Sequence, residues 1–231
     1  MRSHFLLGLF VLVACGGAAS ETAPSTTAGA PSAAPSASSS AAPSASAATA
    51  AALGAAIGKP APDFTLKAVD GTSISLSQFK GKTVVLEWFN PGCPFVTRNH
   101  EKGPLKDMAA KVQKQGVVWL SINSNAKGTQ GYGIDNNKAG IASLHMVNPV
   151  LLDENGMVGH MYGARTTPHL FVIDPAGTLI YRGAIDNAQD GEPTGGAKLV
   201  NYVEAALADL AASKPVQTPE TPSYGCSVKY Q

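Results

Sequence analysis

The stretch VVLEWFNPGCP, residues 84–94, carries the strongest structural signal in the chain. It lies within a run of β-branched and aromatic residues over 83–89, which predicts a buried central strand. The turn sequence Asn90-Pro91-Gly92 follows the run and leads directly to Cys93. Pro94 has no N–H and suits the first turn of a helix, so Cys93 is expected at a helix N-terminus.

This predicted position gives the Cys93 thiol the setting of a nucleophile. Partial positive charge at a helix N-terminus favours the thiolate, which is the reactive form of cysteine. Because turns face solvent, we expect the Cys93 sulfur to be accessible. The alternative is a buried and inert cysteine that packs as a small apolar side chain.

Around this stretch, predicted strands and helices alternate along the chain. Strands are expected over 63–68, 73–76, 83–89, 117–122, 150–152, 169–173 and 178–181, and helices over 94–115 with a break at Gly103-Pro104, about 138–146, 157–162 and 198–212. The last helix is expected to turn its apolar face, which includes Leu199 and Val203, towards the core. This order predicts an α/β fold in which helices cover both faces of a central mixed β-sheet.

Four segments together resemble the thioredoxin superfamily. They are APDFTL (61–66), SLSQFKGK (75–82), VVLEWFNPGCP (84–94) and TTPHLFVIDPAG (166–177). The similarity spans a domain from 58 to about 212 and is to the redoxin or peroxiredoxin-like branch, of the alkyl hydroperoxide reductase and thiol-specific antioxidant type. It implies a thioredoxin-like fold and a thiol oxidoreductase that reduces peroxides or exchanges disulfides.

The resemblance also implies roles for individual residues. Cys93 matches the attacking cysteine of the superfamily, and Pro168, preceded by Thr167, matches the cis-proline that faces this cysteine. Glu87 lies six positions before Cys93, where thioredoxins carry a buried acid that helps to move the thiol proton. A buried carboxyl group there would have a raised pKa and could act as a general base, whereas the alternative is a tolerated edge carboxylate.

Departures from the family pattern leave the reaction open. Val96 stands where thioredoxins have a second cysteine, so a local CxxC disulfide cannot form. Asn90 stands where typical peroxiredoxins have the threonine or serine that orients the peroxide, and Pro168 falls at the place of their strand arginine. Arg98 or Arg165 could take the place of that arginine.

A second cysteine of the predicted mature protein, Cys226, lies in the C-terminal tail, 213–231. About fourteen extended residues after Ala212 can reach roughly 45–50 Å, which is enough to bring Cys226 to Cys93. Three outcomes follow for Cys226. It resolves a mixed disulfide on Cys93, it forms a structural bridge that fixes the tail, or it stays free or pairs with another molecule.

The N-terminal residues predict export and lipidation. Arg2 and the short apolar run 5–14 are typical of a signal peptide, and the Leu-Val-Ala-Cys sequence that ends at Cys15 resembles the bacterial lipobox. Residues 1–15 are therefore expected to be a lipoprotein signal peptide with Cys15 acylated, and the Ala/Ser/Pro-rich residues 16–57 a disordered tether. An ordinary secretory signal that discards Cys15 is the alternative. A periplasm-facing anchor in the outer membrane is expected, because Gly16 is not the aspartate associated with inner-membrane retention.

Composition narrows the remaining classes of function. The net charge is +1 and only 14% of residues are charged, with no basic cluster, so nucleic acid is not an expected partner. No cofactor is expected, and the expected partners are thiol or disulfide proteins or a peroxide, with an electron donor that the sequence does not identify.

A non-catalytic binding module is the second hypothesis, because His100 and His169 with Cys93 could bind copper. Thr97 breaks the CxxxC pattern of copper chaperones, which favours structural roles for both histidines.

Overall fold

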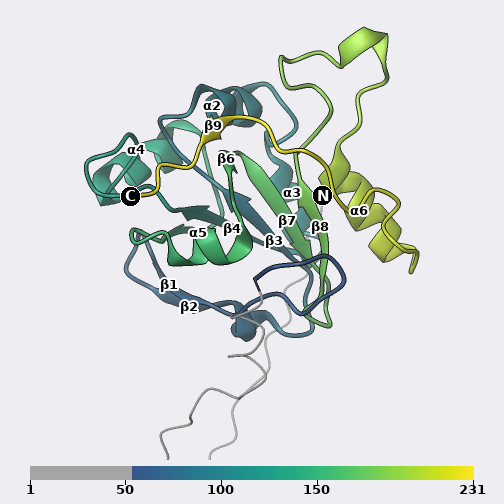
Figure 1. The fold of residues 1–231 in the computed structure, drawn as a ribbon, viewed down its shortest axis with the longest axis horizontal. Helices are drawn as coiled ribbons and strands as arrows, with labels where there is room; N and C mark the ends of the chain where they lie inside the picture. Colours follow the sequence, from purple (N-terminus) through teal and green to yellow (C-terminus); the bar gives the residue numbers. More distant parts are fainter. Residues whose placement is uncertain (1–53) are drawn as a thin grey trace, which may run out of the picture. The chain divides into compact units, whose positions relative to one another are not determined.

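The computed structural model describes residues 54–231, apart from the side chain of Thr194. Within this range a seven-stranded sheet has the order β2-β1-β5-β4-β3-β7-β8, and a separate ribbon pairs β6 with β9 (Figure 1). The strands are β1 (Thr65–Ala68), β2 (Ser73–Ser75), β3 (Val84–Trp88), β4 (Val118–Asn123), β5 (Val150–Leu152), β6 (Thr166–Thr167), β7 (His169–Ile173), β8 (Leu179–Gly183) and β9 (Cys226–Ser227). The helices are η1 (Leu76–Phe79), α2 (Pro94–Glu101), α3 (Met108–Gln113), α4 (Ile134–Ser143), α5 (Met157–Tyr162), η2 (Thr194–Gly196) and α6 (Tyr202–Ala211).

The strand predicted from the decisive stretch is the central strand β3. It pairs parallel with β4 and antiparallel with β7, and all five of its residues are buried. Alternation along β3 sends Leu86 and Trp88 into one core cluster with Tyr162 of α5. It sends Val85 into a second cluster with α3 and α6 on the opposite face. Helices therefore cover both faces of a mixed sheet, which confirms the predicted thioredoxin-like α/β fold.

Most predicted elements are present with small shifts. Strands β5 and β7 and helix α5 have the expected bounds, and the predicted break at Gly103-Pro104 separates α2 from α3. Two helices differ from expectation. Helix α4 begins at Ile134, four residues early, and α6 begins only at Tyr202, where the Asn201 side chain accepts a hydrogen bond from the Glu204 N–H. Leu199 therefore lies before the helix and is 52% exposed, so its predicted place on the inner face is wrong.

The ordered domain starts slightly before the predicted boundary. The Ala55 N–H donates to the Met161 carbonyl at 3.0 Å, and Ile57 packs against the core. Residues 54–57, expected at the end of the tether, thus contact the domain. The signal peptide, Cys15 and the rest of the tether lie outside the described residues. Within residues 54–231 no helix has the length and apolar character needed to cross a membrane.

The C-terminal tail is ordered and follows the surface of the domain for its whole length. Figure 1 shows it in yellow, passing from α6 over β6 and ending near α5. The Tyr224 hydroxyl donates to the buried Asp186 carboxylate at 2.5 Å, and Tyr230 stacks on His160 with ring centroids 4.0 Å apart. Between these two anchors Cys226 pairs with Thr167 in the β6–β9 ribbon, which the sequence did not predict.

Candidate active site

Cys93 sits where the sequence places it, between a central strand and a helix. Strand β3 ends at Trp88, and the following turn is closed by Asn90, whose side-chain Oδ1 accepts the Gly92 N–H at 2.8 Å and whose carbonyl accepts the Cys93 N–H at 3.0 Å. Cys93 is the N-cap residue of α2 and Pro94 is its first helical residue. The predicted strand–turn–helix geometry is therefore present.

The predicted accessibility of Cys93 is wrong. The residue is 0% exposed and packs in a cluster with Phe89, Val96 and Val150, against which Cys226 of the tail also packs. A turn at a sheet edge faces solvent unless another segment covers it, and here β9 lies beside that edge. The burial thus involves the C-terminal tail, which is held on the domain by the β6–β9 ribbon and by contacts of Glu220, Tyr224 and Tyr230.

Three residues that are far apart in the sequence converge on this sulfur. The Thr167–Pro168 peptide is cis, as the family resemblance implies. The Cys93 Sγ–H donates to the Thr167 carbonyl at 3.0 Å, and Thr167 is directly opposite Cys226 in the β6–β9 ribbon. The Thr167 hydroxyl also donates to the Cys226 carbonyl at 3.4 Å. The ribbon thus carries Cys226 to the predicted nucleophile.

The two thiols affect each other's ionisation in opposite directions. Burial opposes ionisation of Cys93, but the neighbouring polar groups of Cys226, Thr167 and Val96 favour the thiolate more strongly, so the pKa of Cys93 is lowered. Burial and donation to the Cys93 sulfur raise the pKa of Cys226 to about 11. Cys93 is therefore the thiol that ionises first, and Cys226 stays protonated beside it.

Glu87 is buried, as predicted, but its contacts point away from a direct role at the thiol. Its carboxylate is 0% exposed and accepts hydrogen bonds from His100 at 2.7 Å, Trp119 at 3.0 Å and Ser121 at 3.1 Å. Among the hydrogen bonds of residues 54–231, none joins Glu87 to Cys93. The geometry favours a positioning role for Glu87, which ties α2 to β3 through His100, and leaves the proposed proton transfer untested.

The Glu87–His100 pair predicts a pH dependence of stability. Burial opposes protonation of His100, but the Glu87 carboxylate raises the net pKa of its imidazole. Because the folded-state pKa exceeds the unfolded value of about 6.5, the charged pair stabilises the fold fully below that pH, and the contribution is lost as the pH rises through the raised pKa. We expect His100→Gln, which can still donate to Glu87, to cost more unfolding free energy near pH 6 than near pH 9. Urea unfolding at both values measures this, and an equal cost would contradict a charged pair.

The residues that depart from the family pattern have identifiable environments. Asn90 is fully buried, and its Nδ2 is the only buried side-chain nitrogen or oxygen of the described residues without a hydrogen-bond partner. Arg98 donates to the Gln189 carbonyl and lies over the Phe95 ring, and Arg165 is exposed beside β6. Neither arginine forms a hydrogen bond with Cys93 in the described part of the chain.

The histidines of the metal hypothesis are both engaged in the fold. His100 pairs with Glu87, and His169 Nδ1 accepts the Arg165 N–H at 3.3 Å. Over residues 54–231, no group of three or more metal-ligating side chains comes together.

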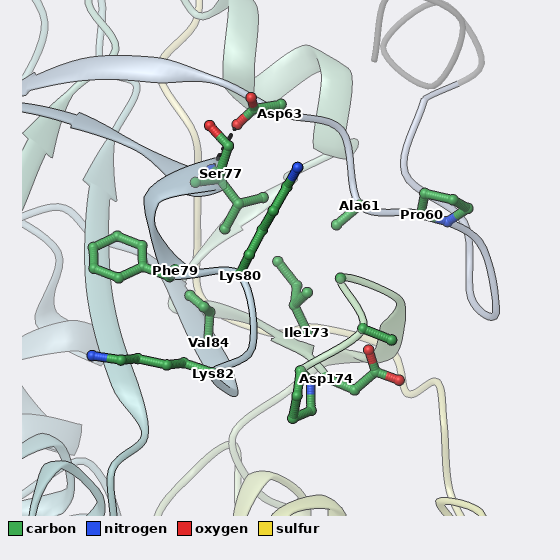
Figure 2. A pocket seen from close by; sticks show the side chains of 14 residues that line it. Pro60, Ala61, Asp63, Ser77, Phe79, Lys80, Lys82, Val84, Ile173 and Asp174 are labelled. Carbon is green, nitrogen blue, oxygen red and sulfur yellow. Dashed lines mark hydrogen bonds between the residues drawn. The ribbon is translucent and has the colours of Figure 1, made fainter. Parts of the chain in front are cut away.

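A cavity of about 510 Å³ lies away from the thiols. Its lining includes Val84 at the start of β3 and Ile173 and Asp174 at the end of β7. Cys93 follows the opposite end of β3. Figure 2 shows the Lys80 side chain extending through this cavity, with its nitrogen between Asp63 and Ala61. Its lining contains no cysteine or histidine, so it is not part of the thiol site.

Comparisons with known proteins agree with this geometry. Residues 56–199 match the family model described as Redoxin. The chain is 32% identical over 130 residues to a thioredoxin peroxidase of Fasciola hepatica, covering 52% of this chain and 66% of that protein. It is 27% identical over 122 residues to the thiol-disulfide oxidoreductase ResA of Bacillus thuringiensis subsp. konkukian, covering 53% and 66%. It is 29% identical over 131 residues to a chloroplastic peroxiredoxin Q of Triticum aestivum, covering 52% and 55%. The chain thus spans between about half and two thirds of the length of these relatives.

Two crystal structures support the same fold over most of the chain. A hypothetical protein of Sinorhizobium meliloti 1021 superposes with a TM-score of 0.67 at 28% identity, covering 76% of this chain and 95% of that one. An uncharacterized conserved protein of Geobacillus kaustophilus superposes with a TM-score of 0.67 at 31% identity, covering 76% and 93%.

Proposed function

Because the chain belongs to the redoxin family, whose matching relatives include peroxiredoxins and thiol-disulfide oxidoreductases, we propose that it is a thiol oxidoreductase whose working pair is Cys93 and Cys226. One observation carries the proposal. The β6–β9 ribbon places Cys226 opposite Thr167, whose carbonyl accepts the Cys93 Sγ–H, and Cys226 packs against the cluster that contains Cys93. A nucleophile and a resolving thiol are thereby placed side by side without a CxxC motif.

The reaction follows the usual course of thiol–disulfide exchange. The Cys93 thiolate attacks one sulfur of a substrate disulfide, breaks the S–S bond and releases one substrate thiolate, which takes up a proton. The Cys226 thiol loses its proton, attacks the Cys93 sulfur of the mixed disulfide and releases the second substrate thiol. The protein is oxidised by two electrons to the Cys93–Cys226 disulfide, and the substrate disulfide is reduced to two thiols.

A hydroperoxide can oxidise the same pair, and the similarity to peroxiredoxins supports this second substrate class. Cys93 would take one peroxide oxygen to become a sulfenic acid, with release of an alcohol or water. Cys226 would then condense with the sulfenic acid, releasing water and forming the same disulfide. Asn90, in place of the usual threonine or serine, makes disulfide exchange the leading reaction.

Other site residues have positioning roles in this proposal. The Thr167 carbonyl accepts the Cys93 Sγ–H, and the adjoining cis Pro168 sets the direction of that carbonyl. Glu87 holds α2, and hence Cys93, through its bond to His100. These contacts support a site whose parts come from β3, α2, β6 and β9.

Turnover assays test the proposal in a Cys15→Ala background, which leaves Cys93 and Cys226 as the chain's cysteines. Reduction of a disulfide substrate and of a hydroperoxide should each be measured with a chemical dithiol as electron donor. We expect Cys93→Ser to lower turnover at least about 1,000-fold, because serine is a far weaker nucleophile at neutral pH. Absence of Cys93-dependent turnover with both substrates, together with stoichiometric copper binding lost in Cys93→Ser, would favour the non-catalytic binding module instead.

We further propose that the domain works in the cell envelope, where it faces the periplasm and is anchored through acylated Cys15. The expected membrane is the outer membrane. The lipobox-like sequence supports this, and disulfides persist in that compartment. Acyl chains contribute about 0.8 kcal/mol per buried methylene, so several chains on one residue hold the protein on a bilayer. We expect Cys15→Ala to move the protein from the membrane fraction to the soluble fraction of bacterial lysates. An unchanged distribution on immunoblots would contradict lipidation.

A further inference from the structure

A second cavity, of about 390 Å³, adjoins the β6–β9 ribbon. Its lining includes Arg165, His169 and Arg182 from the domain and residues 220–223 from the tail. Arg165 directly precedes β6, and Ser223 lies three residues before Cys226. Three extended residues span at most about 10 Å, and β6 pairs with β9, so the cavity lies close to the strand that carries Cys226.

Besides the Glu220 carboxylate, the cavity lining contains side chains that can donate hydrogen bonds. His169 is only 6% exposed, and its Nδ1 accepts the Arg165 N–H, which leaves the proton on Nε2 as a donor. Burial and the charges of Arg182 and Arg165 lower the pKa of His169 to about 3, so the ring is neutral at physiological pH. The Ser223 hydroxyl, which can also donate a hydrogen bond, is part of the lining.

The charge around the cavity is positive. Arg182 is neutralised by Glu220, with Nη2 to Oε1 at 2.7 Å and Nε to Oε1 at 2.8 Å. Arg165 forms no ion pair with any side chain of residues 54–231. One guanidinium charge therefore stays uncompensated beside neutral donors, which is the chemistry that binds a carboxylate.

We propose that this cavity binds the carboxylate of a small thiol that reduces the Cys93–Cys226 disulfide. The inference rests on the proposed function and names the class of its electron donor. The bound thiolate attacks one sulfur of the disulfide and forms a mixed disulfide, and the other protein sulfur leaves and is protonated. A second molecule of the thiol attacks the mixed disulfide, so that two small thiols become one small disulfide and the protein regains both thiols.

The test measures the rate at which oxidised protein, in the Cys15→Ala background, is reduced by thiols of different charge. The probes are 3-mercaptopropionate, 2-mercaptoethanol and cysteamine. For each thiol, the rate of reduction of the protein is divided by the rate at which the same thiol reduces a neutral small-molecule disulfide. We expect a normalised preference of about tenfold or more for the anionic thiol over the neutral one at low salt, falling as salt rises. Arg165→Gln should remove the preference, so that the normalised rates with 3-mercaptopropionate and 2-mercaptoethanol become equal.

Lys229→Gln is the matched control, because Lys229 lies near Cys226 but does not line the cavity. The preference of Lys229→Gln for the anionic thiol should stay within about twofold of the parent's preference. This variant changes only the overall electrostatic potential near Cys226, not the lining of the cavity. Propionate should slow reduction by 3-mercaptopropionate, and propionamide should not. Equal normalised rates for the three thiols, or a preference lost with Lys229→Gln and kept with Arg165→Gln, would overturn the proposal. Failure of the oxidised disulfide to form would instead reject the proposed function.

Discussion

Replacing Gly225 with valine is expected to expose the Cys93 sulfur and to raise its rate of alkylation by iodoacetamide about 10–100-fold. Gly225 has φ +130°, which side-chain-bearing residues rarely adopt, and a Cβ there would lie 2.2 Å from the Thr167 carbonyl oxygen. Because that oxygen belongs to the backbone of β6, it cannot rotate away, and the ribbon must separate. The tail then lifts Cys226 from Cys93, and formation of the disulfide between them should slow.

Gly191→Val is the control for backbone strain alone. Gly191 also has a positive φ, +100°, but a Cβ there meets no atom within 4 Å. This variant should lose some stability without changing the alkylation of Cys93. Peptide mapping of alkylated protein identifies which cysteine has reacted. Equal alkylation rates for Cys93 in the parent and in Gly225→Val would show that the docked tail does not limit access to the sulfur.

Replacing Cys226 with serine is expected to stop the reaction halfway. With excess aromatic disulfide reagent in the Cys15→Ala background, the parent should release two thiolates per chain, the first by attack of Cys93 and the second by attack of Cys226. Cys226→Ser should release one and keep the reagent on Cys93, because a serine hydroxyl cannot displace it. The stable adduct should persist for hours, compared with seconds to minutes in the parent.

Absorbance of the released thiolate and the mass of the intact chain measure this outcome together. Cys93→Ser provides the reciprocal control. It should react slowly, because burial, the largest cause of the raised pKa of Cys226, is still present in this variant and keeps the thiolate fraction small at neutral pH. Rapid adduct formation on Cys226 in that variant would reverse the assignment of nucleophile and resolving thiol.

The local framework of the site could be predicted from the sequence because short-range signals determine it. Apart from Glu87, the run over 84–89 is apolar on both sides of the strand, which is typical of a central strand. The Asn-Pro-Gly turn and Pro94 then set the start of α2, and both are properties of adjacent residues. The cis Thr167–Pro168 bond was implied by the family resemblance, since propensity alone favours trans.

The environment of Cys93 depends on pairing between distant segments, and there the sequence was read incompletely. Its burial involves a tail more than 130 residues away, and the tail offered a signal that was available. Tyr224, Cys226, Val228 and Tyr230 alternate with smaller or polar residues, the period of a strand. Glu87 shows the same limit. Its burial could be predicted from β3, whereas its partners Trp119 and His100 lie on other elements.

The central claim is that Cys93 and Cys226 form one redox pair, and peptide mass mapping of the non-reduced protein tests it most directly. The full chain should be oxidised with a small excess of a disulfide reagent, quenched in acid and digested without reductant. The account predicts a single cross-linked species that joins the peptide containing Cys93 to the peptide containing Cys226 within one chain. Cys93 and Cys226 both recovered unlinked, or links that join Cys226 to a second copy of the chain, would contradict it.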